Sequence, residues 1–180
     1  VAIISILAAL LMPALKNARD SARRIQCMNN LRQLTFAVNS YTEDYDGWYP
    51  TAYLDGGSPW ISDRFIELRY LPASYIDPAG HSRLLLCALL DKGQIGRFTI
   101  GYNSVFLFGK WPPALKKVGD IPKPSEAWMW MDAETLAAEA RYVFWVADDP
   151  TLQINYGYPT FRHSKGINVA YCDGHVAGMT

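Results

Sequence analysis

The sequence lacks an excess of charge of either sign. Its 17 basic and 17 acidic residues balance to a formal net charge of zero over 180 residues. Nucleic-acid-binding domains usually carry a basic face, so the composition gives no support for a nucleic-acid partner. The chain also has no low-complexity tract and no internal repeat of about 20–50 residues, which argues against a solenoid or an array.

Cysteine is scarce, with three residues at Cys27, Cys87 and Cys172. None has the C-x-x-C spacing typical of structural zinc sites. An odd number leaves at most one intramolecular pair and one thiol. A Cys27–Cys87 disulfide would pin the N-terminal segment to the rest of the chain, and an oxidising compartment would favour it. The alternative is that the thiols are small core residues, as we expect for Cys172.

Charge is absent from the first 15 residues, which read VAIISILAALLMPAL and are called the apolar tip below. A membrane-spanning helix needs about 20 apolar residues, so this run alone is short. No initiating Met or basic stretch precedes it, and we expect it to continue a longer hydrophobic segment. A cleaved secretory signal peptide is the alternative, but the helical pattern continues past the tip without a break.

One long helix is predicted over residues 1–42. Beyond the tip, apolar residues recur at spacings of three and four, as in an amphipathic helix. They are Ile25, Met28, Leu31, Leu34, Val38 and Tyr41. Asp46-Gly47 and Pro50 predict where the helix ends. Pro13 removes one helical hydrogen bond and predicts a kink or local unwinding within the tip.

Residues 43–180 are predicted to form one head domain with an antiparallel sheet. Strand-like runs occupy 97–103, 126–131, 142–146, 167–172 and 175–179, a short helix is expected at 60–71, and a proline-rich loop at 111–124. Asp173-Gly174 joins the last two runs, which predicts a β-hairpin with a type I′ turn. The fold class is therefore α+β, with the C-terminal half of the long helix packed on the sheet.

The segment ILAALLMPALKNARDSARRIQCMNNLRQL resembles the N-terminal helix of type IV pilin-like proteins. A second motif specifies the resemblance to a smaller group of these proteins. It consists of His163, nine further residues and Asp173-Gly174. It is similar to the H-x9-D-G signature of type II secretion pseudopilin-like proteins of the DUF1559-like group. YTEDYDGWYP, IGYN and KPSEAWMWMD add to this similarity in the middle of the chain.

This resemblance implies a structural filament subunit and not an enzyme. Such a precursor lies in the inner membrane, is clipped by a prepilin peptidase and becomes part of a periplasmic or extracellular filament of the cell envelope. Its partners would be copies of itself, other pilins or pseudopilins and the secretion machinery. The resemblance places the cleavage site, an N-methylated residue and a nearby glutamate just before Val1. The tip residues expected to assemble are Val1, Ile3, Ile4, Ile6, Leu7, Leu10, Leu11, Pro13 and Leu15.

Two other functional classes stay open. Six tryptophans and other aromatic residues are consistent with a membrane-anchored module that binds a glycan or a protein without polymerising, although a core or subunit interface explains them equally. A tethered hydrolase is the other class. Ser164, His163 and Asp132 contain the residue types of a catalytic triad, but no nucleophile elbow supports it.

No cofactor is expected, and calcium is the one candidate ion. Asp44 and Asp46, with Glu43, form an acidic exit from the long helix, and Asp132 ends a predicted strand; carboxylate oxygens suit Ca²⁺. His163, Asp173 and His175 also combine usual metal ligands near the predicted hairpin. The structural alternatives are a solvated helix end, a turn, and a histidine hydrogen-bonded to the backbone.

Overall fold

The computed structural model describes residues 2–50, 65–75, 84, 100–103, 116–134, 158–163 and 166–179. Helix α1 spans Ala2–Asp44. The strands are β1 (Ile100–Tyr102), β2 (Trp128–Glu134), β3 (Tyr158–Pro159), β4 (Ile167–Tyr171) and β5 (Val176–Met179). Short 3₁₀ turns occupy Ala73–Tyr75 and Val118–Asp120.

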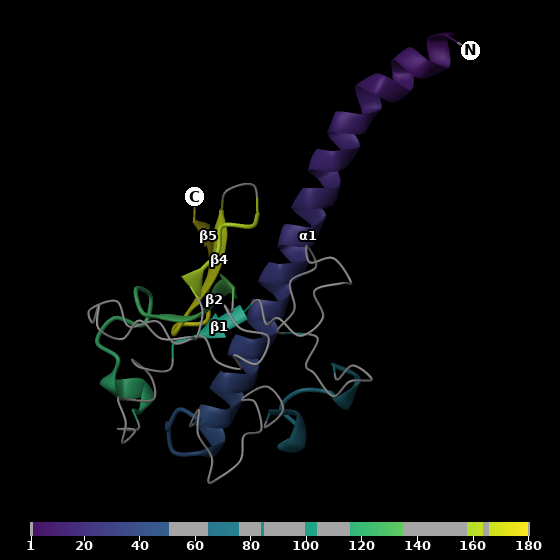
Figure 1. Ribbon diagram of the computed structural model, residues 1–180. Coiled ribbons are helices and arrows are strands. Elements are labelled where there is room, and N and C mark those ends of the chain that lie inside the picture. The colour runs from purple at the N-terminus through teal and green to yellow at the C-terminus, as the bar shows by residue number, and fades with distance from the viewer. Residues whose placement is uncertain are drawn as a thin grey trace.

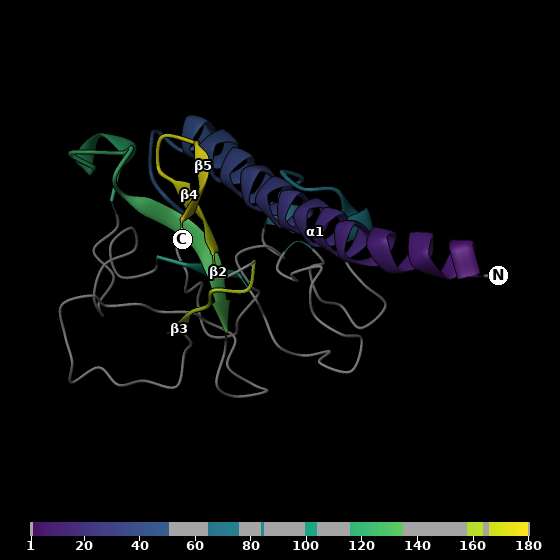
Figure 2. The same ribbon diagram turned by 90° about the horizontal axis from the view of Figure 1, so that it is seen from above.

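The strands of the described residues form one antiparallel sheet in the order β1-β2-β4-β5, with β3 also paired to β2. Helix α1 packs along this sheet in contact with β2, β4 and β5, and its N-terminal end projects beyond the sheet (Figure 1). Figure 2 shows the same arrangement from above, with α1 lying along one side of the strands. The predicted α+β class is confirmed.

The end of α1 is set by two left-handed residues. Asp46 has φ 49° and Gly47 has φ 81°. The Gly47 N–H donates to the Thr42 carbonyl over 2.8 Å, which is the long-range bond of a Schellman cap. The predicted stop at Asp46-Gly47 is therefore correct, and the helix ends at Asp44. Pro13 lies inside a helix that is not interrupted, so the expected local unwinding is absent, although Figure 1 shows α1 curving toward its N-terminus.

The buried face of α1 begins later than the sequence pattern indicates. Ile25 is 57% exposed, and burial starts at Cys27. The prediction was wrong at Ile25 because its neighbour Arg24 is the residue that faces β4 and β5 here, and successive residues of a helix point about 100° apart, so Ile25 faces away from the sheet. From there the buried face consists of Cys27, Leu31, Leu34, Thr35, Ala37, Val38 and Thr42.

The main core lies between α1 and one face of the sheet. Met129 and Trp130 of β2, Ile100 of β1 and Ala170 of β4 cluster with the buried face of the helix. A smaller cluster of Met131, Ile167 and Val169 lies apart from it. Side chains alternate between the two clusters along β4, while an irregularity in the pairing of β2 between Trp128 and Trp130 accompanies the placement of Met129 and Trp130 in the same cluster. Of the predicted strands, 97–103 contains β1 and 126–131 overlaps β2, whereas 142–146 lies outside the described residues.

The C-terminal hairpin is confirmed, but its turn differs from the prediction. Pairing of Ala170 with Val176 continues to Tyr171 opposite His175, which leaves three loop residues. Only Gly174 of the Asp-Gly pair has a positive φ, at 94°. The Gly174 N–H donates to the Tyr171 carbonyl over 3.0 Å. These are the features of a three-residue loop ending in a left-handed glycine and not of a two-residue type I′ turn.

Candidate functional site

The apolar tip is the largest exposed apolar feature of α1. Seven large side chains of the tip are each between 55% and 74% exposed. They are Ile3, Ile4, Leu7, Leu10, Leu11, Met12 and Leu15. Pro13 is also exposed, while the side chains of Val1 and Ile6 lie outside the description. The structure therefore leaves most of the predicted assembly residues without burial in their own chain.

Within the residues that the structure describes, no helix is long and apolar enough to cross a membrane.

A buried polar network lies where α1 meets the open end of the hairpin. His163 Nε2 is 3.3 Å from Asp132 Oδ2, and neither side chain has exposed surface. The same carboxylate oxygen accepts a hydrogen bond of 2.7 Å from the Asn168 N–H. Asn168 Oδ1 in turn accepts one of 3.2 Å from Arg24 Nε on α1. The network thus links α1, β2, β4 and residue 163 through charge-assisted contacts.

The sequence placed His163 in a triad-like set with Ser164 and Asp132 and in a group of metal ligands with Asp173 and His175. In the structure, its side chain lies beside Asp132. Of the three residues with the side-chain types of a catalytic triad, Asp132 and His163 are in contact, while Ser164 lies outside the described residues. The pair is sealed from solvent, so neither side chain is open to a substrate in this arrangement. No spacing in the sequence pairs position 132 with 163, because the contact depends on how β2 and β4 align in the sheet.

A second histidine–aspartate pair lies at the hairpin turn. His175 Nδ1 is 2.6 Å from Asp173 Oδ1, and this oxygen also accepts the His175 N–H over 3.1 Å. Burial alone would raise the pKa of Asp173, but the hydrogen bonds and charge of His175 outweigh it, and the pKa falls below its usual value. The His175 ring stacks on Tyr171 at 4.2 Å. The pair therefore stiffens the exposed turn.

The five predicted metal ligands are dispersed. Asp44 accepts a hydrogen bond of 2.5 Å from the Tyr70 hydroxyl, and Asp46 forms the helix cap. Asp132 and His163 are buried together, and Asp173 belongs to the turn beyond the far end of β4. Among the described residues, no three His, Cys, Asp or Glu side chains come close enough to hold an ion. The described carboxylates and histidines therefore do not form a calcium site.

The two described cysteines, Cys27 and Cys172, are both buried. Cys87 lies outside the described residues, so the Cys27–Cys87 disulfide stays a prediction.

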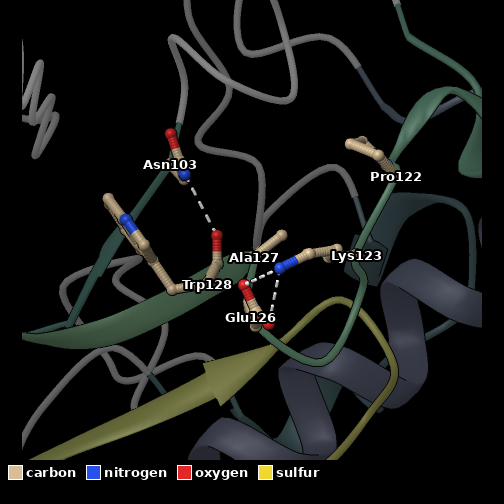
Figure 3. Close-up of a pocket in the computed structure, with 6 residues that line it drawn as sticks. All are labelled: Asn103, Pro122, Lys123, Glu126, Ala127 and Trp128. Atoms are coloured by element: carbon tan, nitrogen blue, oxygen red, sulfur yellow. Dashed lines mark hydrogen bonds and ion pairs between the residues drawn. The ribbon is translucent and has the colours of Figure 1, made fainter.

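One small pocket lies beside β1 and the start of β2, as Figure 3 shows. It has a volume of about 270 Å³ and is lined by Asn103, Pro122, Lys123, Glu126, Ala127 and Trp128. Lys123 Nζ lies 3.0 Å from each Glu126 oxygen, and Asn103 Nδ2 donates to the Trp128 carbonyl over 3.0 Å. None of the predicted site residues lines this pocket, and its polar groups already bind one another.

Comparison with known proteins gives one partial match. A family described as "Protein of unknown function (DUF1559)" matches residues 16–87. The match begins directly after the apolar tip and covers the rest of α1. It supports the expected DUF1559-like similarity, whereas the C-terminal H-x9-D-G motif lies beyond the matched range. No curated protein and no solved structure matches the chain.

Proposed function

We propose that this protein is a structural subunit of a type IV pilus-like or type II secretion pseudopilus filament, polymerising through its apolar tip. The observation that carries the proposal is the tip itself, with its seven large exposed apolar side chains on a helix that projects beyond the sheet. The similarity of residues 16–87 to the DUF1559 family is compatible with a pilin-like surface protein.

The exposed tip is large enough to drive assembly. Full burial of one large apolar side chain contributes about 1.5–3 kcal/mol. For the seven exposed side chains, this gives an upper bound of about 10–20 kcal/mol. Association costs about 4–15 kcal/mol in lost rotational and translational freedom. For a tip that starts in water, burial of most of these side chains is therefore comparable to or larger than the cost of joining a polymer, whereas burial of one or two is not; a tip that starts in lipid gains instead from packing between helices.

The subunit would lie in the inner membrane before assembly and then in a periplasmic or extracellular filament of the cell envelope. The basic residues that follow the tip, Lys16, Arg19 and Arg23, suit the lipid interface at that stage. Other pilins, pseudopilins and the secretion machinery are the proposed partners. We propose no catalytic role, since the triad-like pair of Asp132 and His163 is sealed inside the fold.

Negative-stain microscopy of the full chain tests this function. The double variant Leu10→Asp/Leu11→Asp places two charges in the tip and should abolish filaments, because a buried unpaired charge is costly. Val118→Asp, at a 41% exposed apolar position of the head, is the matched control and should leave filaments intact. Wild-type protein found only as single membrane-bound copies would favour a non-polymerising binding module and sink the proposal.

A further inference from the structure

A groove lies beside the C-terminal part of α1, between this helix, residues 70–75 and the hairpin turn at Gly174. Its volume is about 580 Å³, and Phe36, Tyr70, Leu71, Pro72 and Tyr75 form its apolar wall and floor. Phe36 is 70% exposed although it lies on the same helix as the main core. An aromatic ring left in solvent beside an open apolar groove marks an interaction surface.

The polar groups of the groove favour an apolar occupant. Tyr70 already donates its hydroxyl to Asp44, over 2.5 Å. Thr35 Oγ1 donates to the Leu31 carbonyl over 2.9 Å, and Arg32 Nη1 donates to Asn29 Oδ1 over 2.9 Å. A glycan needs several donors and acceptors that can turn toward it, and the polar side chains of Tyr70, Thr35 and Arg32 are engaged within the chain. Gln33 and Asn39 add two amides to the lining, but apolar surface forms the larger part of it, so the groove suits a mainly apolar occupant.

The uncharged apolar tip has this chemistry, but a chain cannot place its own tip in its own groove. Helix α1 is continuous from Ala2 to Asp44. At about 1.5 Å per residue, Leu10 and Phe36 are about 39 Å apart along the axis. If the tip is the occupant, it must therefore be the tip of another copy.

We propose that this groove receives the apolar tip of a second copy of the chain. One helical turn about 10 Å wide fills roughly 420 Å³, so a groove of about 580 Å³ accommodates about one turn and its side chains. Leu7, Leu10 and Leu11 share one face of such a turn and are at least 55% exposed. They would pack against Phe36 in the manner of a helix in a groove.

This contact determines how copies follow one another. Tip and groove are different surfaces, so the interface is heterologous and extends into an open polymer unless it closes into a ring. If the two helices run parallel, neighbours in contact are offset by about 39 Å along the helix axis. The inference rests on the proposed filament function and specifies which surface of a neighbour the tip meets.

Cross-linking between two singly substituted chains tests the contact. Full-length Leu10→Cys and Asn39→Cys chains are mixed, assembled by detergent removal and oxidised, and the linked peptides are identified by mass spectrometry. Asn39 lines the groove. Val118→Cys, which is exposed and does not line the groove, replaces it in the control. We expect a 10–39 link and no 10–118 link.

Assemblies that form without a preferred 10–39 link would overturn the groove proposal and leave the filament function standing. Absence of any assembly would instead remove both.

A charge in the groove supplies a second readout. Phe36→Asp should reduce assembly at least tenfold, whereas Ile25→Asp should change it little. Both positions are exposed on the same helix, at 70% and 57%, and only Phe36 lines the groove. Both variants should keep the wild-type unfolding midpoint because neither side chain is buried. Equal assembly defects in the two variants would show that the groove has no special role.

Discussion

Single backbone positions decide where α1 stops, and Gly47 is the clearest of them. A side chain at Gly47 would meet nothing within 4 Å, yet the residue has φ 81°. Gly119 also has open space around it, but its φ is not in the left-handed region. Because neither position is crowded, a difference between substitutions at the two glycines measures the backbone strain at Gly47 alone.

We expect Gly47→Ala to lower the free energy of unfolding by about 1 kcal/mol, because L-residues pay about 1–2 kcal/mol in the left-handed region. Gly119→Ala should be neutral or slightly stabilising. Urea denaturation followed by circular dichroism measures both. Equal losses in the two variants would contradict the cap described for α1.

At Cys172, burial is the largest influence on the pKa of the thiol. Burial raises its pKa from 9.0 to about 11, a hydrogen bond with Tyr49 opposes the rise, and the Asp173 carboxylate adds to it. The folded state therefore holds the proton more tightly than the unfolded state. The contribution of the protonated Cys172 thiol to the stability of the fold is fully present below pH 9.0 and is lost as the pH rises through about 11.

The rate of Cys172 alkylation should follow the thiolate fraction and inflect near pH 11 and not near 9. Mass spectrometry of the labelled peptide after brief exposure to iodoacetamide measures it. Asp173→Asn removes a nearby negative charge and should move the inflection to lower pH. An inflection near 9 in the folded wild type would show that the thiol is not desolvated.

At the scale of secondary-structure elements, two histidine–aspartate pairs hold different parts of the sheet. The pair at the hairpin turn is the shorter, at 2.6 Å, and is partly exposed. The pair between β2 and residue 163 is longer, at 3.3 Å, and fully buried. Solvent screening makes exposed pairs weak, while removal of one member of a buried pair leaves the other without compensation.

We therefore expect Asp132→Ala to cost about 3–5 kcal/mol in unfolding free energy, and Asp173→Ala about 1 kcal/mol or less. Denaturant titration of both variants, compared at the unfolding midpoint, gives the difference. Burial thus predicts the larger loss for Asp132→Ala, whereas the shorter distance of the exposed pair would by itself predict the larger loss for Asp173→Ala. Similar losses in the two variants would mean that the buried network does not stabilise the sheet.

Helix α1 and β5 meet where the Arg24 side chain lies over Gly178. A Cβ added at Gly178 would lie 1.8 Å from Arg24 Nη2 and 2.8 Å from Cζ. The guanidinium would have to move, and its 3.2 Å hydrogen bond to Asn168 would break. This glycine therefore matters for its close approach to Arg24 and not for its backbone angles, and because the crowded atoms are the far end of a flexible side chain, a methyl group here costs little more than the displaced contact.

Gly178→Ala should cost about 1 kcal/mol, the value of one hydrogen bond, in the wild type. It should cost nothing when Arg24 is already alanine. A double-mutant cycle on unfolding free energy measures this coupling. Additive effects of the two substitutions would indicate that the arginine does not depend on the glycine.

Local signals in the sequence predicted the elements better than their contacts. Asp173-Gly174 predicted the hairpin, but loop length and turn type depend on the pairing of Tyr171 with His175, which the dipeptide does not encode. The apolar spacing predicted α1, but it placed Ile25 on the buried face because spacing alone does not fix which side of the helix the sheet covers. The Asp132–His163 contact depends on strand order, which is a nonlocal property.

At the scale of the whole molecule, α1 has two apolar surfaces, one buried within the chain and one exposed. The face of α1 from Cys27 to Thr42 is covered by its own sheet, while the tip from Ile3 to Leu15 is exposed. A helix that is satisfied at one end and exposed at the other needs a further partner to bury the rest of its apolar surface. The proposed filament supplies that partner in the form of neighbouring copies.

Sedimentation velocity of the full chain during detergent removal tests this account most directly. The wild type should pass from single copies to fast-sedimenting polymers whose amount rises steeply with protein concentration, while Leu10→Asp/Leu11→Asp stays as single copies. A wild-type chain that remains single and folded at every concentration, with its tip exposed, would contradict the account.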